Sequence, residues 1–465
     1  MTSRTPFDLA AEVGDRLQAA DDRGLNASLH WSEDLLKAEA ERLVARVDPG
    51  VLAGMPVAVK DNFVTRDAPT TCGSRILKGY VSPFEATSVS RLREAGAMIV
   101  AKTNLDEFAM GSSTEHSAYG RVQHPLDPER VPGGSSGGSA ALVAAGVVPA
   151  ALGSETGGSV RQPASFCGIV GVKPSYGRVS RYGLVAFGSS LDCVSVFGQT
   201  VDEAARVLSV ISGHDANDAT SVEEPPMDVP LRPSSLEGVT VGLPREYLPP
   251  DLDPGVRAGI DKAVEALRRL GATVVEVSLP HTKYAVPTYY IIAPAEASAN
   301  LARYDGVRFG PKLSDEASDL RGLYRTTRGT GFGPEVRRRI LIGTYVLSAG
   351  YYEAYYGKAQ RIRAHIARDF TTVFEGGVDV LFTPTTPTTA FRAGEKTEDP
   401  VAMYLADIFT CPANLAGLPG VSLPIGRSDG LPIGGQLLAP YFQEVPMLGV
   451  AGALEAVIDP VAEVR

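Results

Sequence analysis

The segment that most constrains the fold is a stretch rich in glycine, serine and alanine between residues 131 and 183. Apolar residues remain frequent in it, so its composition is not that of a flexible linker. Glycine has no Cβ and lets the backbone approach other atoms closely. The segment therefore predicts backbone packed tightly around a site.

The remainder of the chain alternates between helix and strand patterns. Apolar residues at three- and four-residue spacing predict helices, and short apolar runs bounded by polar residues predict strands. We expect helices within 6–47, 86–96, 256–270 and most of 331–374, and strands at 54–60, 97–102, 238–242, 272–277 and 378–382. No linker composition interrupts this pattern, which favours one large α/β domain with a helical N-terminal arm.

Composition and charge exclude several functions. The chain has 44 Lys and Arg against 54 Asp and Glu, with no basic block, so it is a poor stand-alone nucleic-acid binder. The longest apolar run, 140–153, is too short for a membrane span, and no signal peptide is visible. The scattered cysteines form no C-x-x-C pair, so we expect reduced thiols, no metal site and a cytoplasmic protein; they are Cys72, Cys167, Cys193 and Cys411.

A candidate nucleophile is Ser159, which follows two glycines. Successive glycines let backbone N–H groups converge on one point, as an oxyanion hole requires. None of the six histidines lies at a catalytic or zinc-binding spacing, so the base must be another group. Lys60, at the end of an apolar strand, qualifies if burial lowers its pKa, although a surface lysine is the simpler interpretation of that residue alone.

Three motifs in order resemble the amidase signature family. They are residues 57–62, 133–139 and 153–161, with 24 positions between Ser135 and Ser159, and the match continues through 171–174 and 177–180. The resemblance implies a central mixed β-sheet covered by helices on both faces. It also implies an N-terminal helical arm at 1–50 and a catalytic domain at 51–465, with its motif core at 54–200.

The resemblance assigns roles within these motifs. It implies that Ser159 forms the acyl-enzyme and that Lys60 is the base. Ser135, whose peptide bond is cis in the family, would bridge the two. The oxyanion hole would consist of backbone N–H groups of Thr156, Gly157, Gly158 and Ser159. The chain departs from the usual pattern at Glu155, where aspartate is commoner, and at 193–197, where the resemblance does not predict the local loop structure.

Further segments resemble the glutamine-hydrolysing component of tRNA-dependent amidotransferases; they are 106–115, 296–308, 332–360 and 414–420. This resemblance implies that Arg339 binds the α-carboxylate of glutamine and Asp407 its α-ammonium group. Such pairings suit a planar guanidinium and a carboxylate. A tyrosine of the pair at 289–290 would line the same pocket.

The activity implied is hydrolysis of glutamine, with the ammonia passed to a larger B-type subunit. That partner would use ATP and Mg to amidate Glu-tRNA(Gln), Asp-tRNA(Asn) or both, and a small C-type subunit would complete the assembly. Misacylated tRNA would be held by the partner, and this chain would carry no cofactor. The alternatives are a stand-alone amidase of small amides, a non-catalytic scaffold subunit and, most weakly, a Gly-rich nucleotide-binding module, whose Walker and dinucleotide patterns are absent from 133–139.

Overall fold

The computed structural model describes residues 5–229, 232–309 and 319–458, so the ends of the predicted arm and domain, 1–4 and 459–465, lie outside the described residues. One eleven-stranded sheet runs through the molecule in the order β1-β3-β2-β4-β6-β5-β10-β11-β9-β7-β8. The strands are β1 Ser28–His30, β2 Pro56–Lys60, β3 Met98–Thr103, β4 Ala150–Glu155, β5 Val170–Lys173, β6 Cys193–Gly198, β7 Thr240–Pro244, β8 Thr273–Val277, β9 Val380–Pro384, β10 Gly420–Ser428 and β11 Leu431–Leu438.

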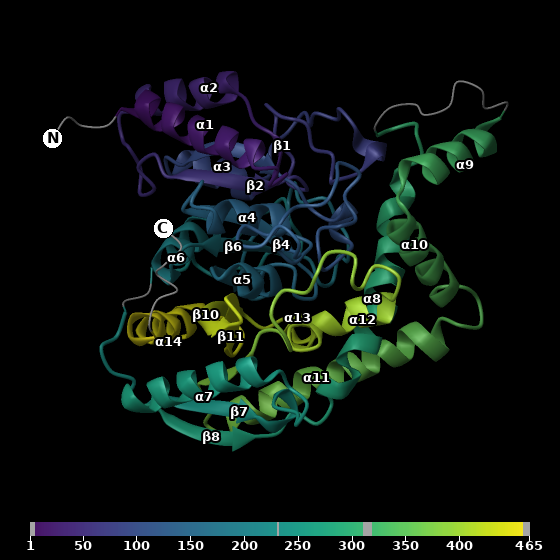
Figure 1. Ribbon diagram of the computed structural model, residues 1–465. Coiled ribbons are helices and arrows are strands. Elements are labelled where there is room, and N and C mark those ends of the chain that lie inside the picture. Colours follow the sequence, from purple (N-terminus) through teal and green to yellow (C-terminus); the bar gives the residue numbers. More distant parts are fainter. Residues whose placement is uncertain (1–4, 230–231, 310–318, 459–465) are drawn as a thin grey trace.

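Helices pack around this sheet along its whole length (Figure 1). They are α1 Pro6–Asp22, α2 Glu33–Val44, α3 Thr87–Glu94, α4 Gly137–Ala144, α5 Arg161–Cys167, α6 Val201–Ile211, α7 Pro254–Arg269, α8 Ala285–Asn300, α9 Leu320–Gly331, α10 Pro334–Val346, α11 Lys358–Glu375, α12 Pro400–Tyr404, α13 Cys411–Ala416 and α14 Glu444–Val457. Among the described residues, no helix has the length and apolar character needed to cross a bilayer.

The sheet is mixed, as predicted. β2 is parallel to both β3 and β4, and β7 is parallel to both β8 and β9, whereas β5, β6, β10 and β11 pair antiparallel with their neighbours. Successive residues of a strand point to opposite faces. Val57 and Val59 of β2 belong to one apolar cluster and Ala58 to another, so both faces of the sheet are covered.

The expected long helix over 331–374 is interrupted. α10 ends at Val346 and α11 begins at Lys358, with a turn and a short π-helix, Glu353–Gly357, between them. Gly350 has φ +85°, a left-handed conformation that an α-helix does not accept. The chain changes direction here, and α11 runs at an angle to α10, toward the middle of the molecule (Figure 1).

The carboxyl ends of two neighbouring parallel strands define where chemistry is concentrated. β2 ends at Lys60 and β4 at Glu155, and the two strands are hydrogen-bonded side by side. In α/β sheets, ligands bind outside the carboxyl ends of such strands. Between them in space lies the glycine-rich loop that leads into α4.

Candidate active site

Lys60 is completely buried and surrounded by hydroxyl groups. Its Nζ lies 2.9 Å from Ser135 Oγ, 2.7 Å from Ser136 Oγ and 3.0 Å from Ser154 Oγ. Burial lowers the pKa of Lys60 to about 7, against the raising effect of the more distant acidic groups Asp106 and Asp192. A neutral amine that can accept a proton is therefore well populated near pH 7.

Three residues that sequence reasoning missed fix the position of this amine. Asn62 donates through Nδ2 to Ser154 Oγ at 2.8 Å, and Ser154 contacts Lys60 through both its hydroxyl and its carbonyl oxygen. Ser136 Oγ donates to the Ser154 carbonyl at 3.2 Å. Each lies one or two positions from a predicted residue, which is the only signal in the sequence that could have found it.

The two predicted serines lie in adjacent backbone segments. The peptide bond between Gly134 and Ser135 is cis, as the family resemblance implies. The backbone N–H of Ser136 donates to the carbonyl oxygen of Ser159 at 3.3 Å, which brings the two segments together. Ser135 is fully buried, whereas Ser159 keeps 8% of its surface exposed and is the more accessible hydroxyl.

The turn between β4 and α5 contains the predicted oxyanion-hole residues. Within the described residues, the backbone N–H groups of 157–159 donate no hydrogen bond. The backbone N–H groups of Val160 and Arg161 both donate to Glu155. Gly158 has φ +150°, and a Cβ there would lie 2.2 Å from Thr410 Oγ1. Glycine is therefore required at this position, and the turn presents free N–H donors as an oxyanion hole would.

A buried ion pair holds this turn in place. Arg161 donates through Nε to Glu155 Oε1 at 2.9 Å, and both side chains are fully buried. Burial alone would raise the pKa of Glu155, but the charge and hydrogen bonds of Arg161 keep it below its ordinary value. The guanidinium also donates to Gln436 and Asn414 at 2.6 Å each. The longer glutamate, where aspartate is commoner, thus makes a complete set of contacts.

Asp407 lies on the other side of the same turn. A Cβ on Gly158 would lie 3.1 Å from Asp407 Oδ1, which shows how close the carboxylate is to the backbone of the turn. Oδ2 accepts a hydrogen bond from Ser112, but the buried Oδ1 has no partner among the described residues. Burial raises the pKa of Asp407 to about 7. A buried oxygen without a partner indicates a place for a donor from a ligand.

Arg339 of α10 is buried among aromatic rings. Its guanidinium lies 5.3 Å from the ring centroid of Tyr290, 5.5 Å from that of Tyr404 and 5.7 Å from that of Phe187. Nε donates to Glu335 Oε1 at 2.8 Å. In the described structure its two terminal nitrogens make no hydrogen bond. Glu335 therefore binds one edge of the guanidinium, and the edge formed by the terminal nitrogens is available to a carboxylate.

The tyrosine pair links the two halves of the site. Tyr289 and Thr156 share a hydrogen bond of 2.8 Å between their hydroxyl groups, and a Cβ on Gly157 would lie 2.9 Å from the Tyr289 ring. Tyr290 stacks on Tyr404 with centroids 3.5 Å apart. The structure thus brings all the predicted site residues into one region, where their roles remain predictions.

The departure from the family pattern at 193–197 is resolved as buried sheet. These residues belong to β6, which lies between β4 and β5 and is completely buried. All four cysteines are buried and unpaired, consistent with the reduced thiols expected.

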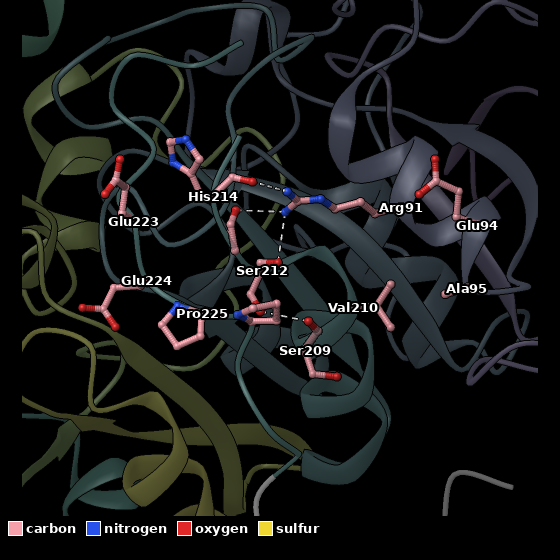
Figure 2. A pocket seen from close by; sticks show the side chains of 12 residues that line it. Arg91, Glu94, Ala95, Ser209, Val210, Ser212, His214, Glu223, Glu224 and Pro225 are labelled. Carbon is pink, nitrogen blue, oxygen red and sulfur yellow. Dashed lines mark hydrogen bonds between the residues drawn. The ribbon is translucent and has the colours of Figure 1, made fainter. Parts of the chain in front are cut away.

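A surface pocket elsewhere has a structural explanation. It has a volume of about 750 Å³ and contains none of the residues above (Figure 2). Its arginine, Arg91, donates to the carbonyl oxygens of Ile211, Ser212, Gly213 and His214 at 2.6–3.0 Å. Arg91 therefore satisfies the carbonyl groups at the end of α6, as helix termini require.

Comparison with known proteins identifies the family to which the chain belongs. It is 55% identical over 94% of its length to the A-type component of the Koribacter versatilis glutamyl-tRNA(Gln) amidotransferase, of which it covers 92%, and 54% identical over 96% to that of Carboxydothermus hydrogenoformans, of which it covers 93%. The crystal structure of the corresponding Thermotoga maritima component matches 96% of this chain and 91% of its own with a TM-score of 0.80 and 46% identity. Because residues 8–448 also match the amidase family as a whole, the chain belongs to the amidase family.

Proposed function

We propose that this chain is the glutamine-hydrolysing subunit of a tRNA-dependent amidotransferase. The observation that carries the proposal is a pair of charged groups that each lack a partner among the described residues: one edge of the Arg339 guanidinium and the buried Oδ1 of Asp407, which lies beside the glycine turn. A free amino acid offers the complementary carboxylate and ammonium groups, whereas a simple amide offers neither. The names of the relatives support the amidotransferase role.

The chemical sequence follows from the hydroxyl groups around the lysine. Neutral Lys60 takes a proton from Ser135, which takes one from Ser159 as that oxygen attacks the side-chain amide carbon of glutamine. N–H groups of Thr156 to Ser159 stabilise the oxyanion. The proton returns to the leaving nitrogen, ammonia departs, and water hydrolyses the glutamyl ester on Ser159. The 2.9 Å contact between Lys60 and Ser135 supports the first step.

The partner subunits complete the proposed reaction. The released ammonia passes to a larger B-type subunit, which uses ATP and Mg to amidate Glu-tRNA(Gln), Asp-tRNA(Asn) or both, and a small C-type subunit joins them. The acidic balance of this chain, 44 Lys and Arg against 54 Asp and Glu, supports a division in which the partner holds the tRNA.

A comparison of two substrates tests the glutamine assignment. Arg339→Ala should raise KM for glutamine by about 10- to 150-fold, since a charged hydrogen bond contributes roughly 1.5–3 kcal/mol, and should change hydrolysis of a small neutral amide less than about threefold. Asp407→Asn should act in the same direction. Equal losses on both substrates would contradict the glutamine pocket and favour a stand-alone amidase of small amides.

A further inference from the structure

The turn between α10 and α11 exposes a group of large apolar side chains, which we call the tyrosine face. Its members and their exposed fractions are Leu341 70%, Ile342 37%, Tyr345 49%, Tyr351 41%, Tyr352 45% and Tyr355 40%. Other exposed apolar residues are spread more thinly, which is normal for a protein surface. A contiguous exposed apolar group is unusual and marks an interaction surface.

The rings of the tyrosine face are already packed on one another. The centroid of Tyr345 lies 4.5 Å from that of Tyr351 and 6.0 Å from that of Tyr355, and the last two are 5.9 Å apart. Leu341 stands one helical turn before Tyr345 on the same side of α10. A surface that is ordered before binding loses little conformational freedom when a partner covers it, and tyrosine is enriched in such contacts.

The exposed charges of the flank that carries the tyrosine face are mainly basic, opposite to the balance of the whole chain. Residues 319–375, which form α9 to α11, have seven exposed Lys and Arg against three exposed Asp and Glu, one of which, Glu353, lies within the face, although the full chain has 44 against 54. Lys358 and Arg361 follow the face on α11 and are exposed. α9, α10 and the turn that follows α10 lie at one side of the molecule, and α11 runs from there toward its middle (Figure 1). The complement of this flank is a protein surface that is apolar at the centre and acidic at the rim.

We propose that the tyrosine face is the docking surface for another subunit of the amidotransferase, one that presents an apolar patch bordered by acidic residues. This inference rests on the proposed function. A second copy of this chain is the less suitable occupant, because a basic flank bound to an acidic body is a heterologous contact that propagates unless it closes a ring. A partner subunit ends the assembly at one contact.

The same helix faces the glutamine pocket. α10 buries Arg339 on its inner side and exposes Leu341 and Tyr345 on its outer side. A protein bound to the tyrosine face would therefore lie one helix away from the group proposed to bind the substrate carboxylate.

The test measures assembly with the B-type and C-type subunits from the organism that encodes this chain. Tyr351→Ser/Tyr355→Ser should raise the dissociation constant at least about tenfold. Tyr182→Ser/Tyr284→Ser, which removes two similarly exposed tyrosines elsewhere, should change it less than about twofold. Lys358→Glu/Arg361→Glu should also weaken binding and reduce its dependence on salt. Thermal unfolding and circular dichroism of each variant show that it is folded.

Other outcomes overturn the inference in distinguishable ways. Unchanged affinity of a folded Tyr351→Ser/Tyr355→Ser variant would place the interface elsewhere and leave the proposed function intact. A wild-type homodimer that this variant dissociates would make a second copy the occupant. Failure of the wild-type chain to bind either partner would contradict the proposed function itself.

Discussion

At the scale of single residues, Lys60 Nζ has four oxygen atoms within 3.3 Å, and its side chain has no contact with solvent. The sequence shows only a lysine at the end of an apolar strand, for which an exposed side chain is the ordinary outcome. Burial among hydroxyl groups is what distinguishes it, and that depends on Ser136 and Ser154 from two other segments. The residues alone make Lys60 a candidate base, and the family resemblance is what favours that role over an exposed side chain.

The pKa values of Lys60 and Asp407, both about 7, predict a pH dependence. Burial lowers the pKa of Lys60 and raises the pKa of Asp407. As pH rises through about 7, Lys60 therefore becomes the neutral amine that can accept a proton, and Asp407 becomes the charged carboxylate that can bind an ammonium group. For a small neutral amide, kcat/KM should fall about tenfold per pH unit below 7, because one proton blocks the reaction.

For glutamine the fall should be steeper, because Asp407 must also be ionised to pair with the α-ammonium group. Initial rates of ammonia release between about pH 5.5 and 8.5 for both substrates measure the two slopes. Equal slopes of kcat/KM against pH for the two substrates would contradict a role of Asp407 in the pH dependence. A flat profile for both substrates would contradict the role of Lys60 as the base.

Substitution of Gly158 should lower kcat by displacing the donors of the oxyanion turn. In Gly158→Ala the new Cβ would overlap Thr410 Oγ1 and the φ of +150° would be strained, so the turn must shift. Misplacing an oxyanion donor costs about 10²- to 10³-fold in kcat. Gly329→Ala is the matched control, because nothing lies within 4 Å of its Cβ and the residue is on an exposed helix. Similar kcat values for the two variants would contradict the assignment of the turn.

At the scale of secondary structure, strand ends were more predictable than helix lengths. The strand that ends at Lys60 and the helix–strand unit of α3 and β3 were expected where they occur. The helix over 331–374 was wrong in its continuity: periodicity continues through residues 347–352, and only the left-handed Gly350 marks the break. Short-range patterns report local preference and do not show where a helix must turn to fit its neighbours.

Residues that join two elements were the ones the sequence could not reveal. Ser112 binds Asp407 from 295 positions away, and Glu335 holds Arg339 from the preceding turn of α10. Neither has a motif of its own. Hydrogen-bond partners of this kind are set by tertiary packing, so they follow from the fold and not from local spacing.

The buried pair of Glu155 and Arg161 predicts a large loss of stability when one member is removed. Arg161→Met leaves the buried carboxylate of Glu155 with its backbone donors but without its counter-charge, which costs about 3–5 kcal/mol. Arg16→Met removes a surface pair with Glu12 and should cost about 0–1 kcal/mol. Thermal unfolding of both variants measures the difference. The double variant Glu155→Gln/Arg161→Met should recover part of the loss, and a double variant no more stable than the single one would contradict an electrostatic cause.

At the scale of the whole molecule, the predicted nucleophile and base lie at the ends of central strands, and α8, α10 and residues 407–411 contribute the residues packed beside them. The motif core supplies the lysine, the serines and the glycine turn, whereas Arg339 and Asp407 come from the second half of the chain. Within the proposed function, the first half performs amide hydrolysis and the second half selects the amide.

The most direct test of this account uses the assembled amidotransferase with two nitrogen donors. Ser159→Ala should abolish tRNA amidation with glutamine, by more than about 10³-fold, because the acyl-enzyme cannot form. Ammonium chloride should restore amidation to the wild-type rate, since the partner's chemistry is untouched. Glutamine-dependent amidation at the wild-type rate by the Ser159→Ala complex would contradict the central claim that this chain releases ammonia through Ser159.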